Sequence, residues 1–199
     1  MTILPATYLG SVAYFARLLR DDCVIDLGEH FVKRSGRNRA RILTANGTMD
    51  LTVQVAHADR PRTPMRAVRL DYSKRWQHQH WMSLVSGYRG SPYFDHYRDR
   101  LEPFYRRRFD FLADYDLELT RLLLEAFGGA MPRISESYVE ASAGDLDLRP
   151  KNSEDPAFVA EPYVQVFSDR LPFAPNLSAA DLLFAEGPGA AALLRRSLR

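Results

Sequence analysis

The sequence predicts a single α/β domain built on a mixed, mostly parallel sheet. Three observations lead to this fold class: strand and helix patterns alternate over the first thirty residues, Asn46-Gly47 separates two short apolar runs, and helical spacing dominates residues 75–126. Strands that alternate with helices form βαβ units, whose strands lie parallel. The length of 199 residues corresponds to one domain, residues 1–199, rather than two.

A βαβ unit opens the chain. Residues 2–8 predict a short strand, and Ser11 can cap a helix over residues 12–20, where small and apolar side chains recur at helical spacing. The compact apolar run at residues 23–27 has the length of a buried strand. Ligands bind at the carboxyl ends of strands in sheets of this kind, so the segment after Leu27 is well placed for a site.

A β-hairpin follows this unit. Asn46-Gly47 is the strongest short-range signal for a tight turn, and it lies between apolar runs at residues 40–44 and 49–55. Apolar and polar residues alternate in the second run, which predicts that one face of the hairpin is buried. Residues 67–71 predict one further strand.

The middle of the chain reads as a series of helices. Helical spacing predicts a first helix over residues 75–86, and two Pro-containing starts predict further helices from residues 91 and 102. A fourth helix begins at Asp114 or Asp116 and ends before a pair of glycines.

The last third of the chain is less regular. Residues 130–160 lack periodicity and are rich in Pro, Ser, Asp and Glu, which predicts an irregular surface segment. Residues 163–167 predict a late strand, and residues 179–184 predict a helix after it.

The composition excludes several classes of function. A net charge of +2 is too small for a domain that grips a nucleic-acid backbone, so the local positive charge points to a small anionic ligand. No apolar stretch reaches the length of a membrane span. The only cysteine, Cys23, lies in an apolar run, and the N-terminus lacks the pattern of a signal peptide, so a cytoplasmic location is expected.

The sequence assigns no cofactor and no metal. The common motifs of phosphate-binding loops, serine hydrolases and zinc proteases are missing. Surfaces rich in Tyr and Arg would suit a contact between subunits, but composition does not locate one.

Residues 30–41 form a basic loop, with five cationic side chains within residues 33–41 and Gly36 among them. Guanidinium groups form forked hydrogen bonds to phosphate and carboxylate, whereas lysine supplies a compact charge. A loop of this kind beyond the end of a strand could hold a diphosphate or a carboxylated substrate. The alternative is a solvated loop whose arginines pair with acidic residues, and the residues alone favour this alternative.

Two groups of residues could take part in acid–base chemistry. Asp26 and His30 precede the basic loop, and a carboxylate with an imidazole can exchange protons near neutral pH. Trp76 and His80 lie four residues apart and share one face of the first predicted helix. His78 and His80 point to different sides, so no metal pair is expected there. The alternative is that Asp26 caps a turn and that the histidines are structural.

Several short motifs are spread along the chain: Tyr14-Phe15, Val24-Ile25-Asp26, Glu29-His30-Phe31-Val32-Lys33, Arg37-Asn38-Arg39 with Ile42, Trp76, His80-Trp81, Tyr88 with Ser91-Pro92-Tyr93-Phe94, Tyr163 with Gln165-Val166-Phe167, and Pro175-Asn176-Leu177-Ser178 with the residues up to Pro188. Their identity and order resemble the WbqC-like family over nearly the whole length of the chain, least between residues 129 and 160.

The resemblance implies an enzyme of bacterial O-antigen and surface-polysaccharide synthesis. Such an enzyme would act on a sugar nucleotide or an amino sugar and would attach an acyl or aminoacyl group to the sugar amine. The resemblance gives Lys33, Arg37 and Arg39 the role of holding a diphosphate, and makes His30 or His80 the candidate general base. The remaining residues expected at the site are Asp26 for catalysis and Asn38, Trp76, Tyr88 and Gln165 for substrate binding.

Two hypotheses from different classes follow. A group-transfer enzyme predicts that His30, Arg37, Asn38 and His80 converge on one cleft. A non-catalytic binding or assembly protein for an anionic small ligand of the same pathway predicts a basic cleft with no titratable group beside it.

Overall fold

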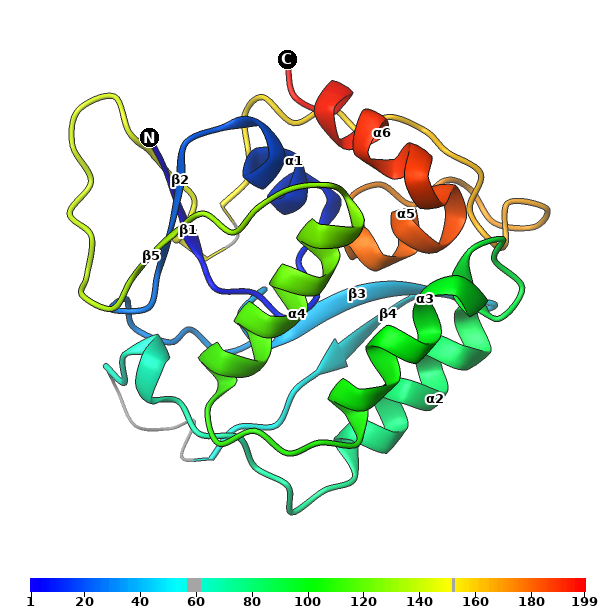
Figure 1. Ribbon diagram of the computed structural model, residues 1–199, viewed down its shortest axis with the longest axis horizontal. Helices are drawn as coiled ribbons and strands as arrows, with labels where there is room; N and C mark the ends of the chain where they lie inside the picture. The colour runs from blue at the N-terminus through cyan, green and yellow to red at the C-terminus, as the bar shows by residue number, and fades with distance from the viewer. Residues whose placement is uncertain (57–61, 152) are drawn as a thin grey trace.

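The α/β fold predicted from the sequence is confirmed by the computed structural model, which describes residues 1–56, 62–151 and 153–199. The chain forms a four-stranded parallel sheet and a separate two-stranded antiparallel hairpin, with helices packed against both (Figure 1). Among the described residues, no helix is both long enough and apolar enough to cross a membrane.

The parallel sheet has the strand order β5-β2-β1-β6. Its central strands, β1 (Thr2–Pro5) and β2 (Cys23–Asp26), are joined by α1 (Val12–Arg20), which confirms the predicted βαβ unit. The outer strands are β5 (Arg133–Ser135) and β6 (Leu146–Asp147), each parallel to its neighbour. These two strands have three and two residues, which is too short to show an apolar period in the sequence.

The predicted hairpin is also confirmed. β3 (Arg39–Thr44) and β4 (Gly47–Thr52) pair antiparallel, and the turn lies at Asn46-Gly47. Gly47 has a φ of +104°, a conformation that favours glycine and explains the turn. The further strand predicted at residues 67–71 is reduced to two isolated bridges, because its neighbours are single loop residues rather than a strand.

Three helices follow in the middle of the chain: α2 (Trp76–Tyr88), α3 (Phe94–Leu101) and α4 (Leu112–Ala126). α2 packs against β3 of the hairpin and α3 packs against α5 (Ala179–Glu186), while α4 is drawn between α1 and the hairpin in Figure 1. The helix expected from residue 102 is only a single 3-10 turn. Among the described residues, the 3-10 turns are η1 (Met65–Ala67), η2 (Glu102–Tyr105) and η3 (Gly187–Gly189).

The end of the chain differs from the prediction in two respects, an absent strand and an additional helix. Residues 163–167 form no strand, because the side chain of Gln165 takes the pairing role that a strand backbone would have: it accepts from the Ala174 N–H at 2.9 Å and donates to the Ala174 carbonyl at 2.9 Å. The late helix is confirmed as α5 (Ala179–Glu186), and α6 (Ala190–Arg196) follows it.

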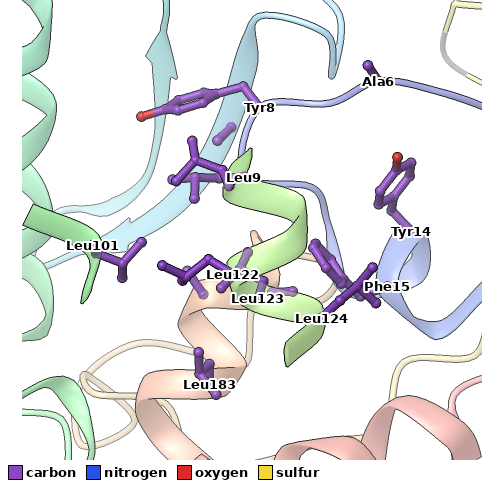
Figure 2. Close-up of a cluster of buried hydrophobic side chains, with 14 of the residues drawn as sticks. Ala6, Tyr8, Leu9, Tyr14, Phe15, Leu101, Leu122, Leu123, Leu124 and Leu183 are labelled. Carbon is purple, nitrogen blue, oxygen red and sulfur yellow. The ribbon is translucent and has the colours of Figure 1, made fainter. Parts of the chain in front are cut away.

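The main hydrophobic core joins α1, α4 and α5. Leu122, Leu123 and Leu124 of α4 are buried together with Phe15 of α1 and Leu183 of α5 (Figure 2). Because these helices bury their apolar faces against one another, the N-terminal βαβ unit and the C-terminal helices form one core. This packing fixes the loop between β1 and α1, where a cavity opens.

Candidate functional site

A cavity of about 650 Å³ lies at the carboxyl end of β1. Its walls come from β1 and the loop to α1, from the basic loop and the start of β3, from residues after β6, and from residues 175–178. β1 lies between β2 and β6, and the chain leaves β1 toward β2 while β6 flanks the other side. The ends of β1 and β6 therefore form a switch point, which is where sheets of this kind bind ligands.

The described walls of the cavity carry more positive than negative charge. The cationic side chains that line it are Arg34, Arg37, Arg39, Arg41, Arg149 and Lys151, and the acidic ones are Asp50, Glu154 and Asp155. Within the part of the chain that the structure describes, Arg34 and Lys151 are exposed and form no ion pair. A concave surface with this excess attracts phosphate or carboxylate groups.

Arg37 is committed to partners within the protein. Its Nε donates to Glu29 Oε1 at 2.8 Å, and its Nη2 donates to Glu29 Oε2 and, at 2.8 Å, to the carbonyl oxygen of Arg149. The Arg37 side chain is only 3% exposed. Burial raises the pKa of Glu29, and the hydrogen bonds from Arg37 oppose that rise. Arg37 therefore has a structural role in the floor of the cavity, because its Nε and Nη2 donors are used within the protein.

Asp26 holds Arg149 in the same floor. Asp26 Oδ1 accepts from two backbone N–H groups of the turn that follows β2, at 2.8 and 3.2 Å. Asp26 Oδ2 accepts from the backbone N–H of Val139 at 3.1 Å and from Nη1 of Arg149. Arg149 also pairs with Asp147 at 2.7 Å. The carboxylate of Asp26 is thus surrounded by donors, and its position orients a cation that lines the cavity.

The remaining expected residues of the basic loop lie in different places. Arg39 lines the cavity, as Arg37 does. Asn38 is buried, and its Nδ2 donates to a backbone carbonyl just beyond β4 at 3.1 Å. Lys33 and His30 are exposed and do not belong to the described cavity walls.

His80 lies behind the cavity wall. Tyr8 lines the cavity, and its hydroxyl group is hydrogen-bonded to His80 Nδ1 at 2.9 Å and to the Tyr105 hydroxyl at 3.1 Å. In Figure 2 the Tyr8 ring points away from the side on which Tyr14 lies. Burial lowers the pKa of His80 to about 4, so its imidazole is neutral at neutral pH. Trp76 packs edge-on against it, with ring centroids 5.3 Å apart. His80 therefore positions Tyr8.

Tyr88 and Gln165 meet away from the cavity, around Asp181. The Tyr88 hydroxyl donates to Asp181 Oδ2 at 2.8 Å, and the Tyr163 hydroxyl donates to Asp181 Oδ1 at 2.6 Å. Gln165 Nε2 lies 3.4 Å from the same oxygen. Burial raises the pKa of Asp181, and these donors oppose the rise. The cluster fastens α2 and α5 to the extended segment before α5.

The N-terminus of α1 faces the cavity, but its donors are occupied by the protein itself. The backbone N–H of Val12 donates to the Leu177 carbonyl at 2.9 Å, and that of Ala13 donates to Asn176 Oδ1 at 2.9 Å. The next N–H group donates to Ser11 Oγ at 3.3 Å. An anion in this cavity would therefore rely on side chains rather than on the end of the helix.

Asn176 makes a first prediction possible, because it caps α1 from a left-handed conformation with a φ of +54°. Asn176→Gly removes the hydrogen bond that the Asn176 side chain accepts from the Ala13 N–H and should lower the free energy of unfolding by about 0.5–1.5 kcal/mol. Asn176→Ala should cost about 1–2 kcal/mol more, because alanine is strained at positive φ. Denaturant unfolding of both variants tests this, and equal losses would contradict the role of the backbone conformation.

Sequence reasoning missed several residues of the cavity. Arg149 gave no signal, because it lies in an aperiodic segment and is brought to the site only by β6. Asn176 stood in a matching motif, but its contact with α1 is a long-range one. Asp50 is one polar residue of an alternating strand, and only the register of the hairpin places it beside Arg41.

No metal-binding cluster of His, Cys, Asp and Glu is present in the described ranges. The six cationic side chains that line the described part of the cavity suit it to binding an anionic group through guanidinium and ammonium donors, with Tyr8 and the apolar residues of β1 as the inner wall.

Comparisons with known proteins agree with the resemblance seen in the sequence. The model of the WbqC-like protein family matches residues 6–153, which include most of the cavity walls. A protein of Mycobacterium tuberculosis described as uncharacterized protein Rv1507c is 29% identical over 106 residues. That match covers 53% of this chain and 46% of the relative, so the chain spans about half the length of that protein. No solved structure matches the chain.

Proposed function

The chain belongs to the WbqC-like protein family, and on that premise we propose that it binds an anionic small molecule of the nucleotide-sugar class in the cavity at the end of β1. In this proposal it is a group-transfer enzyme of surface-polysaccharide (O-antigen) synthesis that moves an acyl or aminoacyl group to a sugar amine. The family resemblance supports the pathway, and the cavity supports the ligand class.

The observation that carries the proposal is the excess of cationic side chains at the switch point of the sheet. Arg37 and Arg149 are neutralised by buried carboxylates, and Asp50 is shared by two arginines of β3. Arg34 and Lys151 add charge at the exposed side. The cationic side chains that line the cavity repel one another, and a bound diphosphate would reduce that repulsion. The sugar of a bound nucleotide would fit the volume of about 650 Å³.

The residues expected for catalysis take positioning roles in this proposal. Asp26 holds Arg149, and His80 holds Tyr8, and both held residues line the cavity. His30 is exposed outside the described walls and takes no role.

A second candidate, a non-catalytic binding protein for the same ligand class, is favoured by one observation. No histidine or cysteine occurs among the cavity residues that the structure describes. Asp50 and Asp155 form ion pairs, so Glu154 is the acidic side chain without an ion pair among the described residues that line the cavity. Turnover of a nucleotide sugar and an acyl donor would favour the enzyme, and binding without turnover would favour this candidate.

The test of the proposal is a binding measurement on a charge-neutral double variant. Thermal shifts first identify a nucleoside-diphosphate sugar that stabilises the parent protein, since a ligand of the native state raises its apparent stability. Arg34→Gln/Lys151→Gln should then bind that compound about 5- to 30-fold more weakly in calorimetry, because two charge contacts are lost.

A matched control is available in Lys74→Gln/Arg89→Gln, which removes two exposed cations outside the described cavity walls. This variant should bind like the parent. Equal affinity of all three proteins, or equal weakening by both double variants, would overturn the proposed location of the ligand.

A further inference from the structure

Asp50 lies between two arginines on the wall of the cavity. It faces Arg41 across the hairpin, and Arg39 lies two residues before Arg41 on the same face of β3. Arg41 Nε donates to Asp50 Oδ1 at 2.9 Å, and Arg39 Nη1 donates to Asp50 Oδ2 at 3.3 Å. All three side chains line the cavity. One carboxylate therefore bridges two guanidinium groups at a site that a ligand can reach.

The two guanidinium groups keep donors that Asp50 does not use. Arg39 Nε is buried and has no hydrogen-bond partner among the described residues. The Arg41 side chain is 59% exposed and those of Arg39 and Asp50 are 31% and 27% exposed, so the group is open to solvent on one side. Two neighbouring guanidinium groups suit a phosphate as well as they suit a carboxylate.

We infer that Asp50 is an internal competitor that occupies the oxyanion subsite of the cavity between Arg39 and Arg41, and that it lowers the affinity for the phosphate groups of the ligand. The inference rests on the proposed function, because it assigns the phosphate groups to one end of the same cavity. It predicts that loss of the carboxylate charge strengthens binding. If Asp50 instead served to position the arginines, the same loss would weaken binding.

Calorimetry with inorganic pyrophosphate at low salt measures whether loss of the Asp50 carboxylate charge raises or lowers the affinity. Asp50→Asn should bind pyrophosphate about threefold to tenfold more tightly than the parent, since the repulsion by one nearby carboxylate is removed and both arginines become available. Asp50→Ser should also bind pyrophosphate more tightly than the parent, and because serine has no amide group this variant shows that the gain does not come from the asparagine amide. Arg41→Gln should bind more weakly, and raising the salt concentration should reduce all differences.

Asp95→Asn is the matched control, because Asp95 is an 84% exposed carboxylate of α3 that pairs with Arg98 outside the described cavity walls. It should leave the affinity unchanged, and denaturant unfolding without ligand verifies that all variants are folded.

Unchanged or weaker binding by both Asp50 variants, with normal binding by the parent, would overturn this inference and leave the proposed function standing. If neither the parent nor the Asp50 variants bound pyrophosphate or a nucleotide sugar, the proposed function would fall together with it.

Discussion

Replacing Arg37 with methionine is expected to lower the free energy of unfolding by about 3–5 kcal/mol, because the change leaves a buried carboxylate without its partner. The side chains of Arg37 and Glu29 are 3% and 6% exposed, and their two carboxylate contacts lie in the floor of the cavity. Methionine keeps an apolar stem of similar length, so most of the loss is electrostatic. Denaturant unfolding at neutral pH measures it.

The pH dependence identifies the cause of that loss. Without Arg37, the hydrogen bonds that hold down the pKa of Glu29 are gone, and burial raises this pKa further. A group whose pKa is raised in the folded state loses its contribution as the pH rises through that value, so the defect should grow toward alkaline pH and shrink toward acid pH. Glu29→Gln combined with Arg37→Met should recover part of the stability. A loss below about 1 kcal/mol, typical of surface pairs, would contradict the assigned role of Arg37.

Replacing Asp116 with leucine is expected to raise the free energy of unfolding by about 2–4 kcal/mol at neutral pH, because it removes an unpaired polar group from the core. Asp116 is 0% exposed on α4, and neither carboxylate oxygen has a hydrogen-bond partner among the described residues. Leucine has nearly the same shape as aspartate, so little repacking is needed.

The same variant has a defined pH profile. Burial raises the pKa of Asp116 well above its ordinary value, and among the described residues Tyr8, Tyr14 and Tyr115 interact with it electrostatically. The parent therefore loses stability as the pH rises from the ordinary Asp pKa toward the raised one, by up to about 1.4 kcal/mol per pH unit, and the gain in Asp116→Leu grows over that range.

Asp114→Leu is the control for that experiment, since Asp114 is exposed in the first turn of the same helix. It should change stability by no more than about 0.5–1 kcal/mol, and in the destabilising direction, because an acidic residue near a helix N-terminus is favourable. A destabilised Asp116→Leu would show that the carboxyl group has a partner that leucine cannot replace.

Local patterns predicted the parts of the fold that depend on local physics. The βαβ unit follows from the apolar runs and the Ser11 cap, and the hairpin follows from Asn46-Gly47. The strand expected at residues 163–167 is absent because the Gln165 side chain pairs with Ala174. Such a long-range side-chain contact leaves no periodic trace in a sequence.

For the basic loop, residues 30–41, the sequence predicted the location at the cavity but not which arginines are paired within the protein. Its position after β2 and its charge indicated a site, and Arg37 and Arg39 do line the cavity. The pairing of Arg37 with Glu29, and of Arg39 and Arg41 with Asp50, agrees with the alternative interpretation of arginines that pair with acidic residues. Which arginines keep donors for a ligand depends on burial and register, and neither can be derived from charge spacing alone.

An anionic ligand is expected to bind at the carboxyl ends of β1 and β6, and amide chemical-shift mapping can locate it there residue by residue. Titration of the labelled protein with a nucleoside-diphosphate sugar should shift the signals of Thr7, Gly36 and Arg39, which line the cavity of about 650 Å³. Signals around the smaller cavity near Gly90 and Val164 should stay in place. Shifts confined to that second cavity, or spread evenly over the exposed arginines of the surface, would show that the ligand does not bind at the ends of β1 and β6.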